Sequence, residues 1–398
     1  MMFGMIQGNS WEMLVKRTLS FSLFSMLTIS ISFAQVDKTL IDYFLPIPIQ
    51  SVLVSEGTWG ETNVFPRDTT NGLEDATLKK WCYWDGSIVK DDEGLYHMYA
   101  SHWTQEMTHR DGWHIGTKAI HSVSENVLGP YVEKGLVYPN WKEGLGHNTV
   151  ALRTHDGKYA VIISEVTRGE IFISNSPNGP FKLLGEIKVD PNGFDPGLAR
   201  YGNKNAGAVR GGVVGHMSNV SLLLRPDGNY MIIPRSTAPM ISENGILGPY
   251  KIMGDKIYKG MEGIPQEKME DPTVWYSGDM YHMVVNHHGV DSSYHFTSPD
   301  GIHNWKSRGI AFSKNAAIFK YTNGIVNQWS IVQRMTVYVE NGHPTHFLFS
   351  VIDVPKGKDR QNDNHGSKIL VVPFDGKAFD KDMRKLVQSE KKGGRKSN

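Results

Sequence analysis

The chain has 398 residues, enough for one large domain or two ordinary ones. Its 42 Lys and Arg residues almost balance its 41 Asp and Glu residues, so the formal net charge is only +1 at pH 7. A chain without a basic excess has little to neutralise phosphates with, which argues against a nucleic-acid partner. Aromatic residues make up 11% of the sequence, a share that suits both a β-rich core and a sugar-binding cleft.

The first 34 residues have the layout of a signal peptide. The basic pair Lys16-Arg17 precedes a charge-free apolar run over residues 19–33, and a small-residue cleavage pattern ends at Ala34. The run is short for a membrane span, and the alternative is a buried N-terminal helix. We expect residues 1–34 to be removed, which predicts a secreted or periplasmic bacterial protein with no membrane span in its mature form. Cys82 is the only cysteine, so no intramolecular disulfide can form.

A hairpin pattern recurs five times in the middle of the chain. In its first copy the apolar run 81–90 leads to a turn at Glu93-Gly94, and an aromatic-rich return strand follows. The later copies turn at Asp156-Gly157, Asp227-Gly228, Gly278-Asp279 and Asn341-Gly342. Strand pairs that repeat without helices between them favour a propeller over a solenoid. The sequence therefore predicts an all-β fold, a five-bladed β-propeller in which each hairpin forms the two inner strands of a blade.

A polar residue stands at the head of each first strand. In four copies this residue precedes the turn glycine by nine positions, and the remaining copy, headed by Asp271, has a tighter turn. The five heads are Asp85, Asn148, Asn219, Asp271 and Gln333. In a propeller they would form a ring around the axis, and this ring is where we expect the chemistry.

A second repeat marks the outer part of the blades. The pairs Gly129-Pro130, Gly179-Pro180 and Gly248-Pro249 each follow a Ser-containing strand. We expect each pair to turn the chain into an edge strand of its blade.

The propeller is assigned to residues 81–376. Before it, residues 35–80 are polar and rich in Gly, Thr and Asp, and we expect them to form an extension that packs on the propeller. After it, residues 377–398 form a C-terminal tail. The tail is charged and Gly-rich from Lys391 onward, so we expect that part to be disordered.

Several motifs resemble the five-bladed propeller glycoside hydrolases. They are Trp84-Asp85-Gly86, Gly146-His147-Asn148 and Glu270-Asp271-Pro272, and the likeness extends over residues 43–376. Family 43 shares the architecture, but the order and spacing are more similar to family 117, the exo-acting α-1,3-(3,6-anhydro)-L-galactosidases that act on agar oligosaccharides. The resemblance implies hydrolysis of an oligosaccharide substrate, and it leaves a homodimer open.

The resemblance also implies where the reacting groups lie. The family has an Asp on the first blade, an Asp on the fourth, and an acidic residue beside a histidine on the fifth. The first two correspond to Asp85 and Asp271, but Gln333 stands where the Glu is expected and Val332 where the histidine is expected. An amide cannot exchange a catalytic proton as a carboxyl group does, so the general acid must lie elsewhere.

Each candidate has a functional and a structural interpretation. Asp85 would be the general base that activates water, or a structural Asp that binds backbone amides between blades. Asp271 would bind a sugar hydroxyl group or shift the pKa of a nearby general acid. Its neighbour Glu270 should point away, because strand neighbours alternate faces. His147 is a candidate for the acid, or else a histidine that is hydrogen-bonded between blades.

The remaining candidates are groups that would bind sugar: Trp84, Asn148, Asn219, Gln333, Arg334, Trp103 and His287. Hairpin geometry predicts that His287 lies at the far end from Asp271, so that only the loop beyond it can fold back over the face. Trp103 belongs to an insertion whose histidines and tryptophans would make a sugar platform or a metal site, although no ligand pair has a recognised spacing. We expect no cofactor, with a structural divalent cation in the funnel left open.

Three functions remain open on these residues. The first is an exo-glycosidase, which the pair Asp85 and Asp271 favours. The second is a degenerate propeller that binds a sugar without cleaving it, which Gln333 favours. The third is a polysaccharide lyase, which needs a His or Tyr base. We rank the enzyme first, because buried carboxylates cost desolvation and a pure binder has less use for two of them.

Overall fold

The computed structural model describes residues 38–164, 169–194, 209–210, 213–214, 219–235, 237–288, 292–359 and 364–394. Residues 38–398 form one unit, and the predicted signal peptide, residues 1–34, lies outside the described residues. No helix in the described ranges is long and apolar enough to cross a membrane.

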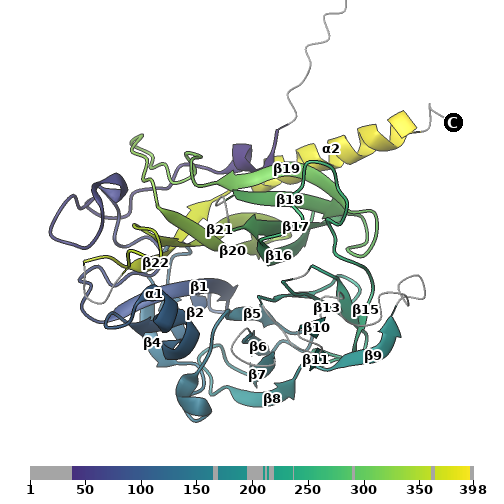
Figure 1. Cartoon of the computed structure of the whole chain (residues 1–398), viewed down its shortest axis with the longest axis horizontal. Helices are drawn as coiled ribbons and strands as arrows, with labels where there is room; N and C mark the ends of the chain where they lie inside the picture. The colour runs from purple at the N-terminus through teal and green to yellow at the C-terminus, as the bar shows by residue number, and fades with distance from the viewer. Residues whose placement is uncertain are drawn as a thin grey trace, which may run out of the picture. The chain divides into compact units, whose positions relative to one another are not determined.

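Five antiparallel sheets follow one another in chain order around a common axis (Figure 1). Blade 1 contains β1 (Trp81–Lys90), β2 (Tyr96–Thr104), β3 (Lys118–Ser124) and β4 (Val132–Leu136). Blade 2 contains β5 (Val150–Arg153), β6 (Tyr159–Ile162), β7 (Glu170–Ser174) and β8 (Lys182–Glu186). Blade 3 contains β12 (Ser221–Leu224), β13 (Tyr230–Ile233), β14 (Met240–Ser242) and β15 (Tyr250–Ile252), with β9 (Val189–Phe194) added in parallel at its edge.

The last two blades complete the circle. Blade 4 contains β16 (Met269–Ser277), β17 (Met280–His287), β18 (Ser292–Ser298) and β19 (Lys306–Ser313). Blade 5 contains β20 (Ile331–Glu340), β21 (His343–Ile352) and β22 (Ser367–Pro373). The remaining elements are η1 (Leu40–Tyr43), η2 (Thr62–Val64), α1 (His109–Asp111), η3 (Gly112–Gly116), η4 (Lys142–Gly144), the ladder of β10 (Val209–Arg210) and β11 (Val213–Val214), and α2 (Gly376–Gly394).

The predicted five-bladed all-β propeller is confirmed. The five hairpins of the sequence are the strand pairs β1–β2, β5–β6, β12–β13, β16–β17 and β20–β21. The Gly-Pro pairs lie between β3 and β4, between β7 and β8, and between β14 and β15, as the second repeat predicts. Apolar residues of facing blades fill the space between sheets; for example, Trp275 of blade 4 packs edge-on against Phe347 of blade 5.

Residues before β1 join the first and last blades. Blade 5 has three strands of its own, and Leu73 exchanges two backbone hydrogen bonds of 3.0 Å with Ile369 of β22. The neighbouring Gly72 N–H donates to Leu128 O of blade 1 at 2.7 Å. Gly72 has a φ of +72°, and a Cβ placed there would lie 1.8 Å from the carbonyl oxygen of Ile369. Only glycine permits so close an approach between the two strands.

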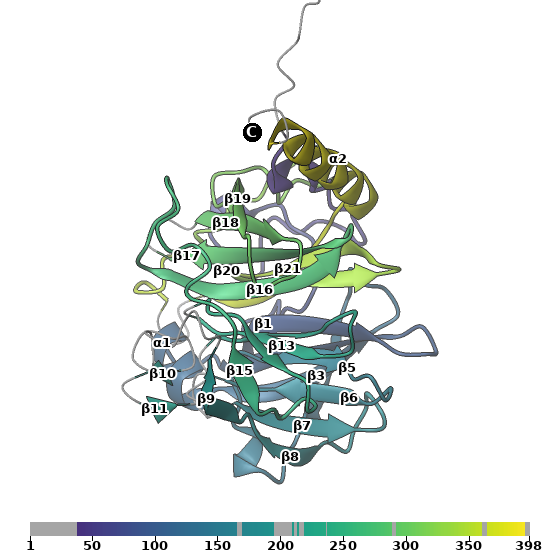
Figure 2. The same ribbon diagram turned by 90° about the vertical axis from the view of Figure 1, so that its right-hand side faces the viewer.

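The C-terminal helix α2 lies against blades 4 and 5 (Figure 2). The Asp380 carboxylate accepts a hydrogen bond from Ser277 Oγ of blade 4 at 2.7 Å and lies 2.5 Å from His343 Nδ1 of blade 5. Glu390 pairs with Lys306 and Arg308 of β19. The sequence analysis assigned no element to this tail, and the expected disorder from Lys391 is wrong as far as Gly394.

Candidate functional site

One residue at the head of each inner strand has a left-handed backbone. The φ angles are 62° at Asp85, 51° at Asn148, 47° at Asn219, 56° at Asp271 and 52° at Arg334. Non-glycine residues adopt this conformation only rarely. In every blade the regular pairing of the hairpin resumes two residues later, at Ser87, Val150, Ser221, Thr273 and Thr336. We call the five left-handed residues the axial ring.

The fifth member of the axial ring is Arg334, so the prediction of Gln333 at this position is wrong by one residue. The first hairpin closes with a loop between Lys90 and Tyr96, whereas the fifth closes with the two residues between Glu340 and His343. A second register shift lies between Tyr338 and Val339. The turn glycines are therefore not equivalent. Counting nine residues back from Gly342 reaches Gln333, one residue before the ring member Arg334.

Hydrogen bonds close the axial ring on itself. Arg334 donates from Nε to Asp85 Oδ1 at 2.6 Å and from Nη1 to Asp271 Oδ1 at 3.1 Å. Asn219 Nδ2 donates to Asp271 Oδ1 at 2.6 Å, and Asn148 Nδ2 donates to Asn219 Oδ1 at 2.6 Å. The Asn148 N–H completes the circle by donating to Asp85 Oδ2 at 3.0 Å. One network thus links the inner strands of all five blades.

The residue before each ring member forms a second layer, which we call the funnel layer. It consists of Trp84, His147, Glu270 and Gln333, and the corresponding residue of blade 3 lies outside the described residues. The alternation of the strand breaks at the left-handed residue, so neighbours in sequence face the same cavity. The expectation that Glu270 points away is therefore wrong, because Glu270 and Asp271 both line one pocket.

This funnel pocket has a volume of about 230 Å³. Its walls consist of Trp84, Trp113, His147, Asn148, Asn219, Arg235, Glu270, Asp271, His288, Gln333, Arg334 and Lys356. The pocket brings together seven of the predicted site residues. They are Asp271, His147, Trp84, Asn148, Asn219, Gln333 and Arg334.

Two predicted sugar-binding residues are not in the pocket. Trp103 is fully buried and packs in a core cluster with Cys82 and Trp84, so it is no sugar platform. His287 does not line the pocket, although its neighbour His288 does. The predicted distance from Asp271 was wrong because an antiparallel return strand ends beside the head of its partner, and Glu270 pairs with Asn286.

Three residues that follow the return strands also line the pocket and were not predicted from the sequence. Arg235 comes after β13, His288 after β17 and Lys356 after β21. The same antiparallel geometry would have brought them to the mouth of the funnel. Trp113, which was grouped with the insertion, stacks on His147 with ring centroids 5.2 Å apart and lines the pocket.

Asp85 is the fully buried anchor of the site. Its Oδ1 accepts from Arg334, and its Oδ2 accepts from Ser101 Oγ at 2.9 Å and from the Asn148 N–H, with His147 Nδ1 at 3.3 Å. Burial alone would raise the pKa of Asp85, but His147, Arg334 and the two hydrogen bonds hold it below its ordinary value. Asp85 is therefore an ionised carboxylate that joins three blades, and its side chain has no exposed surface.

Glu270 has the opposite electrostatic setting. Burial, followed by the charge of neighbouring Asp271, raises the pKa of Glu270 to about 7. Its oxygens lie 2.5 Å from Arg235 Nη2 and 3.2 Å from His288 Nδ1. The pocket thus holds a carboxyl group that can keep a proton up to about pH 7, beside Asp271, whose Oδ1 accepts hydrogen bonds from Asn219 and Arg334.

The insertion after β2 does not form a metal site. His109 is buried, with its ring against Trp84 and Trp103 at 4.7 and 5.2 Å, and His102 stacks on Trp81 at 3.9 Å. Among the described residues, no three His, Cys, Asp or Glu side chains are grouped so as to hold a metal ion.

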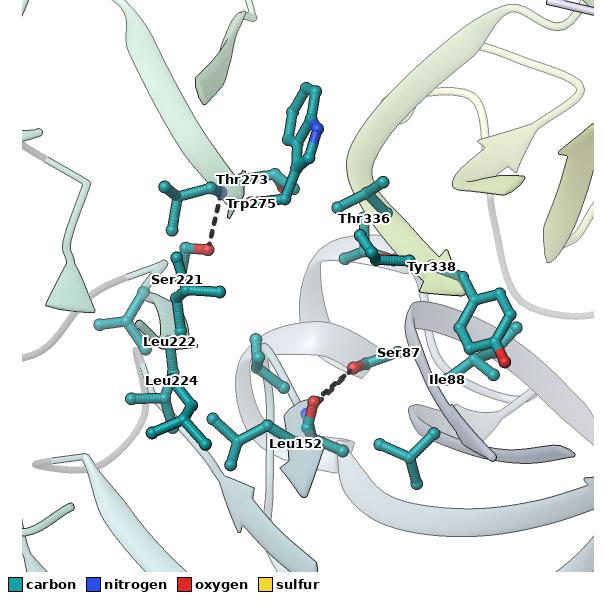
Figure 3. A pocket seen from close by; sticks show the side chains of 18 of the residues that line it. Ser87, Ile88, Leu152, Ser221, Leu222, Leu224, Thr273, Trp275, Thr336 and Tyr338 are labelled. Atoms are coloured by element: carbon teal, nitrogen blue, oxygen red, sulfur yellow. Dashed lines mark hydrogen bonds between the residues drawn. The ribbon is translucent and has the colours of Figure 1, made fainter. Parts of the chain in front are cut away.

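A second cavity, the axial channel, lies along the inner strands (Figure 3). Its volume is about 470 Å³, and Arg334 lines both cavities, so the axial ring separates the channel from the funnel pocket. Two serines of the channel join neighbouring blades. Ser221 Oγ accepts a hydrogen bond from the Val274 N–H at 3.0 Å, and Ser87 Oγ accepts one from the Ala151 N–H at 3.0 Å. No Asp, Glu or His is among the described residues that line the channel.

Comparisons with known proteins support the fold. No protein-family model and no curated protein matches the chain. A solved structure described as a glycoside hydrolase matches with a TM-score of 0.50 and 15% identity, covering 76% of this chain and 61% of that one. At this identity the match shows a fold shared with a glycoside hydrolase.

Two further structures are similar to a slightly lesser degree. Zg3597, a family 117 glycoside hydrolase of Zobellia galactanivorans, has 13% identity over 77% of this chain and 89% of that one, with a TM-score of 0.49. The exo-β-1,3-galactanase 1,3Gal43A of Clostridium thermocellum has 10% identity over 81% of this chain and 62% of that one, with a TM-score of 0.49.

Proposed function

We propose that the chain is a glycoside hydrolase in which Glu270 is the general acid and Asp271 the second carboxyl group at the reacting centre. The observation that carries the proposal is the contrast between these neighbours. Glu270 has a pKa of about 7, whereas Asp271 accepts hydrogen bonds from Asn219 and Arg334. Glycosidic bond cleavage requires two carboxyl groups in different settings, one of which can donate a proton near neutral pH.

In the proposed reaction Glu270 donates its proton to the glycosidic oxygen. The negative charge that then forms on Glu270 is stabilised by Arg235, whose guanidinium lies 2.5 Å away. Asp271 stabilises the positive charge that develops at the anomeric carbon and takes the proton of the attacking water. Its fixed hydrogen bonds hold the carboxylate in place for both tasks.

Asp85 has a different role in this proposal from the general base of the sequence analysis. Both of its oxygens are occupied and its side chain is inaccessible to water, so it is poorly placed to activate a water molecule. It acts as a positioning residue instead. It orients Arg334, which in turn holds Asp271, and it lies beside His147 at the pocket wall.

The substrate is an oligosaccharide that places one terminal sugar in the pocket. A volume of about 230 Å³ is below the range of roughly 300–1,000 Å³ usual for drug-sized ligands. Trp84 and Trp113 supply aromatic surface, and Asn148, Asn219 and Gln333 supply amides for hydroxyl groups. The agar-type galactan substrate follows from the resemblance to family 117, and export follows from the signal-peptide pattern at residues 1–34.

The experiment is incubation of the purified protein with neoagarobiose and a panel of other galactan disaccharides, with the products separated by chromatography. We expect release of a terminal sugar from at least one member by the wild type. The E270Q variant should release about 10²–10⁴-fold less per unit time, the usual contribution of a general acid.

The second candidate function is a propeller that binds a sugar without cleaving it. It is favoured by Gln333, which lines the funnel pocket where the resemblance implies a carboxyl group. Tight binding of a disaccharide with no product after prolonged incubation would select this candidate over the hydrolase.

A further inference from the structure

The side-chain amides of the funnel pocket have fixed directions. An amide oxygen only accepts hydrogen bonds and an amide NH2 only donates them, so a neighbour that can do only one of the two decides which end faces it. Arginine and lysine side chains only donate. Arg334 and Lys356 both line the pocket, and each begins a run of hydrogen bonds that ends at an amide.

The first run leads from Arg334 to Asn148. Arg334 Nη1 donates to Asp271 Oδ1 at 3.1 Å, so this oxygen is an acceptor. Asn219 therefore turns its Nδ2 toward the same oxygen, at 2.6 Å, and its Oδ1 faces the other way. Asn148 donates from Nδ2 to that Oδ1 at 2.6 Å. The run uses both ends of the Asn219 amide but only the nitrogen of the Asn148 amide.

The second run is a single hydrogen bond. Lys356 Nζ lies 2.6 Å from Gln333 Oε1, and an ammonium group cannot accept, so the oxygen end of the Gln333 amide faces the lysine. Further contacts of the ammonium leave this direction unchanged, because the lysine donates in every one of them. The Nε2 end of Gln333 therefore points away from Lys356.

The two remaining amide atoms, Asn148 Oδ1 and Gln333 Nε2, open onto the pocket. Within the described part of the chain neither atom has a hydrogen-bond partner, and neither is among the unpartnered polar atoms that are sealed from solvent. Both residues line the pocket while being only 1% and 6% exposed. An amide end in so buried a setting is costly to leave without a partner, and a ligand in the pocket can supply one.

We propose that the pocket recognises its sugar through one fixed acceptor, Asn148 Oδ1, and one fixed donor, Gln333 Nε2. The sugar must offer a hydroxyl hydrogen to Asn148, whereas any hydroxyl, ether or ring oxygen satisfies Gln333. The proposal rests on the proposed hydrolase function, because it concerns the sugar in the same pocket. It narrows the amides that read the sugar from three to two, since Asn219 sets the direction of Asn148 instead.

Two chemical replacements on the sugar distinguish a fixed donor from a fixed acceptor. Replacing a hydroxyl group by hydrogen removes both its donor and its acceptor, whereas fluorine keeps a weak acceptor and cannot donate. The position that faces Gln333 should therefore tolerate fluorine but not hydrogen. The position that faces Asn148 should tolerate neither, because both replacements leave the amide oxygen without a donor.

The test is isothermal titration calorimetry on the wild-type full chain. The ligands are D-galactose and its derivatives in which the hydroxyl group at carbon 2, 3, 4 or 6 is replaced by hydrogen or by fluorine. At one position we expect the fluoro sugar to bind within about threefold of galactose and the deoxy sugar about tenfold or more weakly. At a second position we expect both derivatives to bind about tenfold or more weakly.

Variants of the two residues assign these positions. Q333M removes the donor, so fluorine and hydrogen should become equivalent at the first position, and Q333E presents an acceptor there, so fluorine should be rejected. N148G removes the acceptor and suits the left-handed backbone at φ 51°, so the second position should become indifferent to both replacements. In each variant the other positions should keep their wild-type contrasts, which a merely structural effect would not spare.

The matched control is Q328M, which alters an exposed glutamine that does not line the pocket and should change no affinity. Far-ultraviolet circular dichroism checks that each variant is folded. If a variant does not fold, the series of sugars on the wild type decides alone.

Three outcomes would overturn the inference. They are no binding of galactose at millimolar concentration, no position that tolerates fluorine while rejecting hydrogen, and a contrast that Q333M or N148G leaves unchanged. The hydrolase proposal is judged separately, by product release from the galactan disaccharides. The expected contrasts without any product would leave this inference standing and remove the hydrolase, and product release without the contrasts would do the reverse.

Discussion

Arg334 Nε donates to Asp85 Oδ1 at 2.6 Å and so ties the last blade of the propeller to the first, across 249 positions of sequence. Both residues are left-handed members of the axial ring, and both are almost completely buried. This hydrogen bond therefore helps to close the propeller, and it also affects the electrostatics of the funnel pocket, where Arg334 donates to Asp271 as well.

The first prediction concerns the stability of this pair. R334M leaves two buried carboxylates without their common cation, which should lower the free energy of unfolding by about 3–5 kcal/mol. Adding D85N to R334M removes one of the stranded charges, so the double variant should lose less than the sum of the single losses. Urea unfolding followed by tryptophan fluorescence measures all four proteins. Additive losses would mean that the pair does not interact in solution.

The second prediction concerns pH. The acid must carry its proton, and the pKa of Glu270 is raised to about 7, so turnover should be highest below pH 7 and should fall as pH rises through it. Titration of this group causes the loss on the alkaline side. A profile of kcat against pH on the identified disaccharide measures it, and an alkaline limit several units higher would remove Glu270 as the acid.

The third prediction separates Asp85 from Asp271. D271N should lose turnover by orders of magnitude, and azide should restore part of it, because a small anion can enter the space that the carboxylate faces in the pocket. D85N should also lose turnover, but azide should not restore it, since Asp85 is buried and does not line the pocket. Rescue of D85N alone would return the base role to Asp85.

The fourth prediction concerns Gln333. Q333E would place a carboxylate beside Lys356, whose Nζ now lies 2.6 Å from the amide oxygen, and would add a negative charge near Glu270. The pKa of Glu270 should rise further, so the alkaline limit of kcat should move to higher pH. An unchanged profile would show that Gln333 does not act on the electrostatics of Glu270.

The fifth prediction concerns propeller closure. G72A forces a Cβ against the Ile369 carbonyl, where the distance would be 1.8 Å, and should separate the extension from β22. G57A is the matched control, since Gly57 has a similar φ of +77° but nothing within 4 Å of the added atom. G57A should cost only the left-handed penalty of about 1–2 kcal/mol, and G72A clearly more. Equal losses in thermal unfolding would mean that the strand contact adds no stability.

The sequence predicted the number of blades because each hairpin carries its own turn and apolar run. It also predicted four of the five ring residues, since Asp85, Asn148 and Asn219 share one spacing to the turn glycine and Asp271 heads the copy with the tighter turn. Arg334 was missed as the ring member because the spacing from strand head to turn glycine differs in blade 5. That spacing depends on register shifts, which a residue count does not reveal.

The funnel layer was missed for a related reason. Strand alternation predicts that Glu270 and Asp271 face opposite ways, and a single left-handed residue cancels that rule. Lys356 and Arg235 were missed because they come after the return strands, in segments without a repeat of their own. The helix α2 was missed because its charged sequence was taken for a solvated tail, although Phe379 and Met383 are buried.

If Glu270 protonates the leaving group, the effect of its removal should depend on whether the leaving group needs a proton. The measurement compares kcat/KM of E270Q with that of the wild type on the disaccharide that the wild type cleaves and on the matching glycosyl fluoride, whose leaving group needs no proton. We expect a loss of about 10²–10⁴-fold on the disaccharide and a much smaller loss on the fluoride. Equal losses on both substrates, or no loss on the disaccharide, would contradict it.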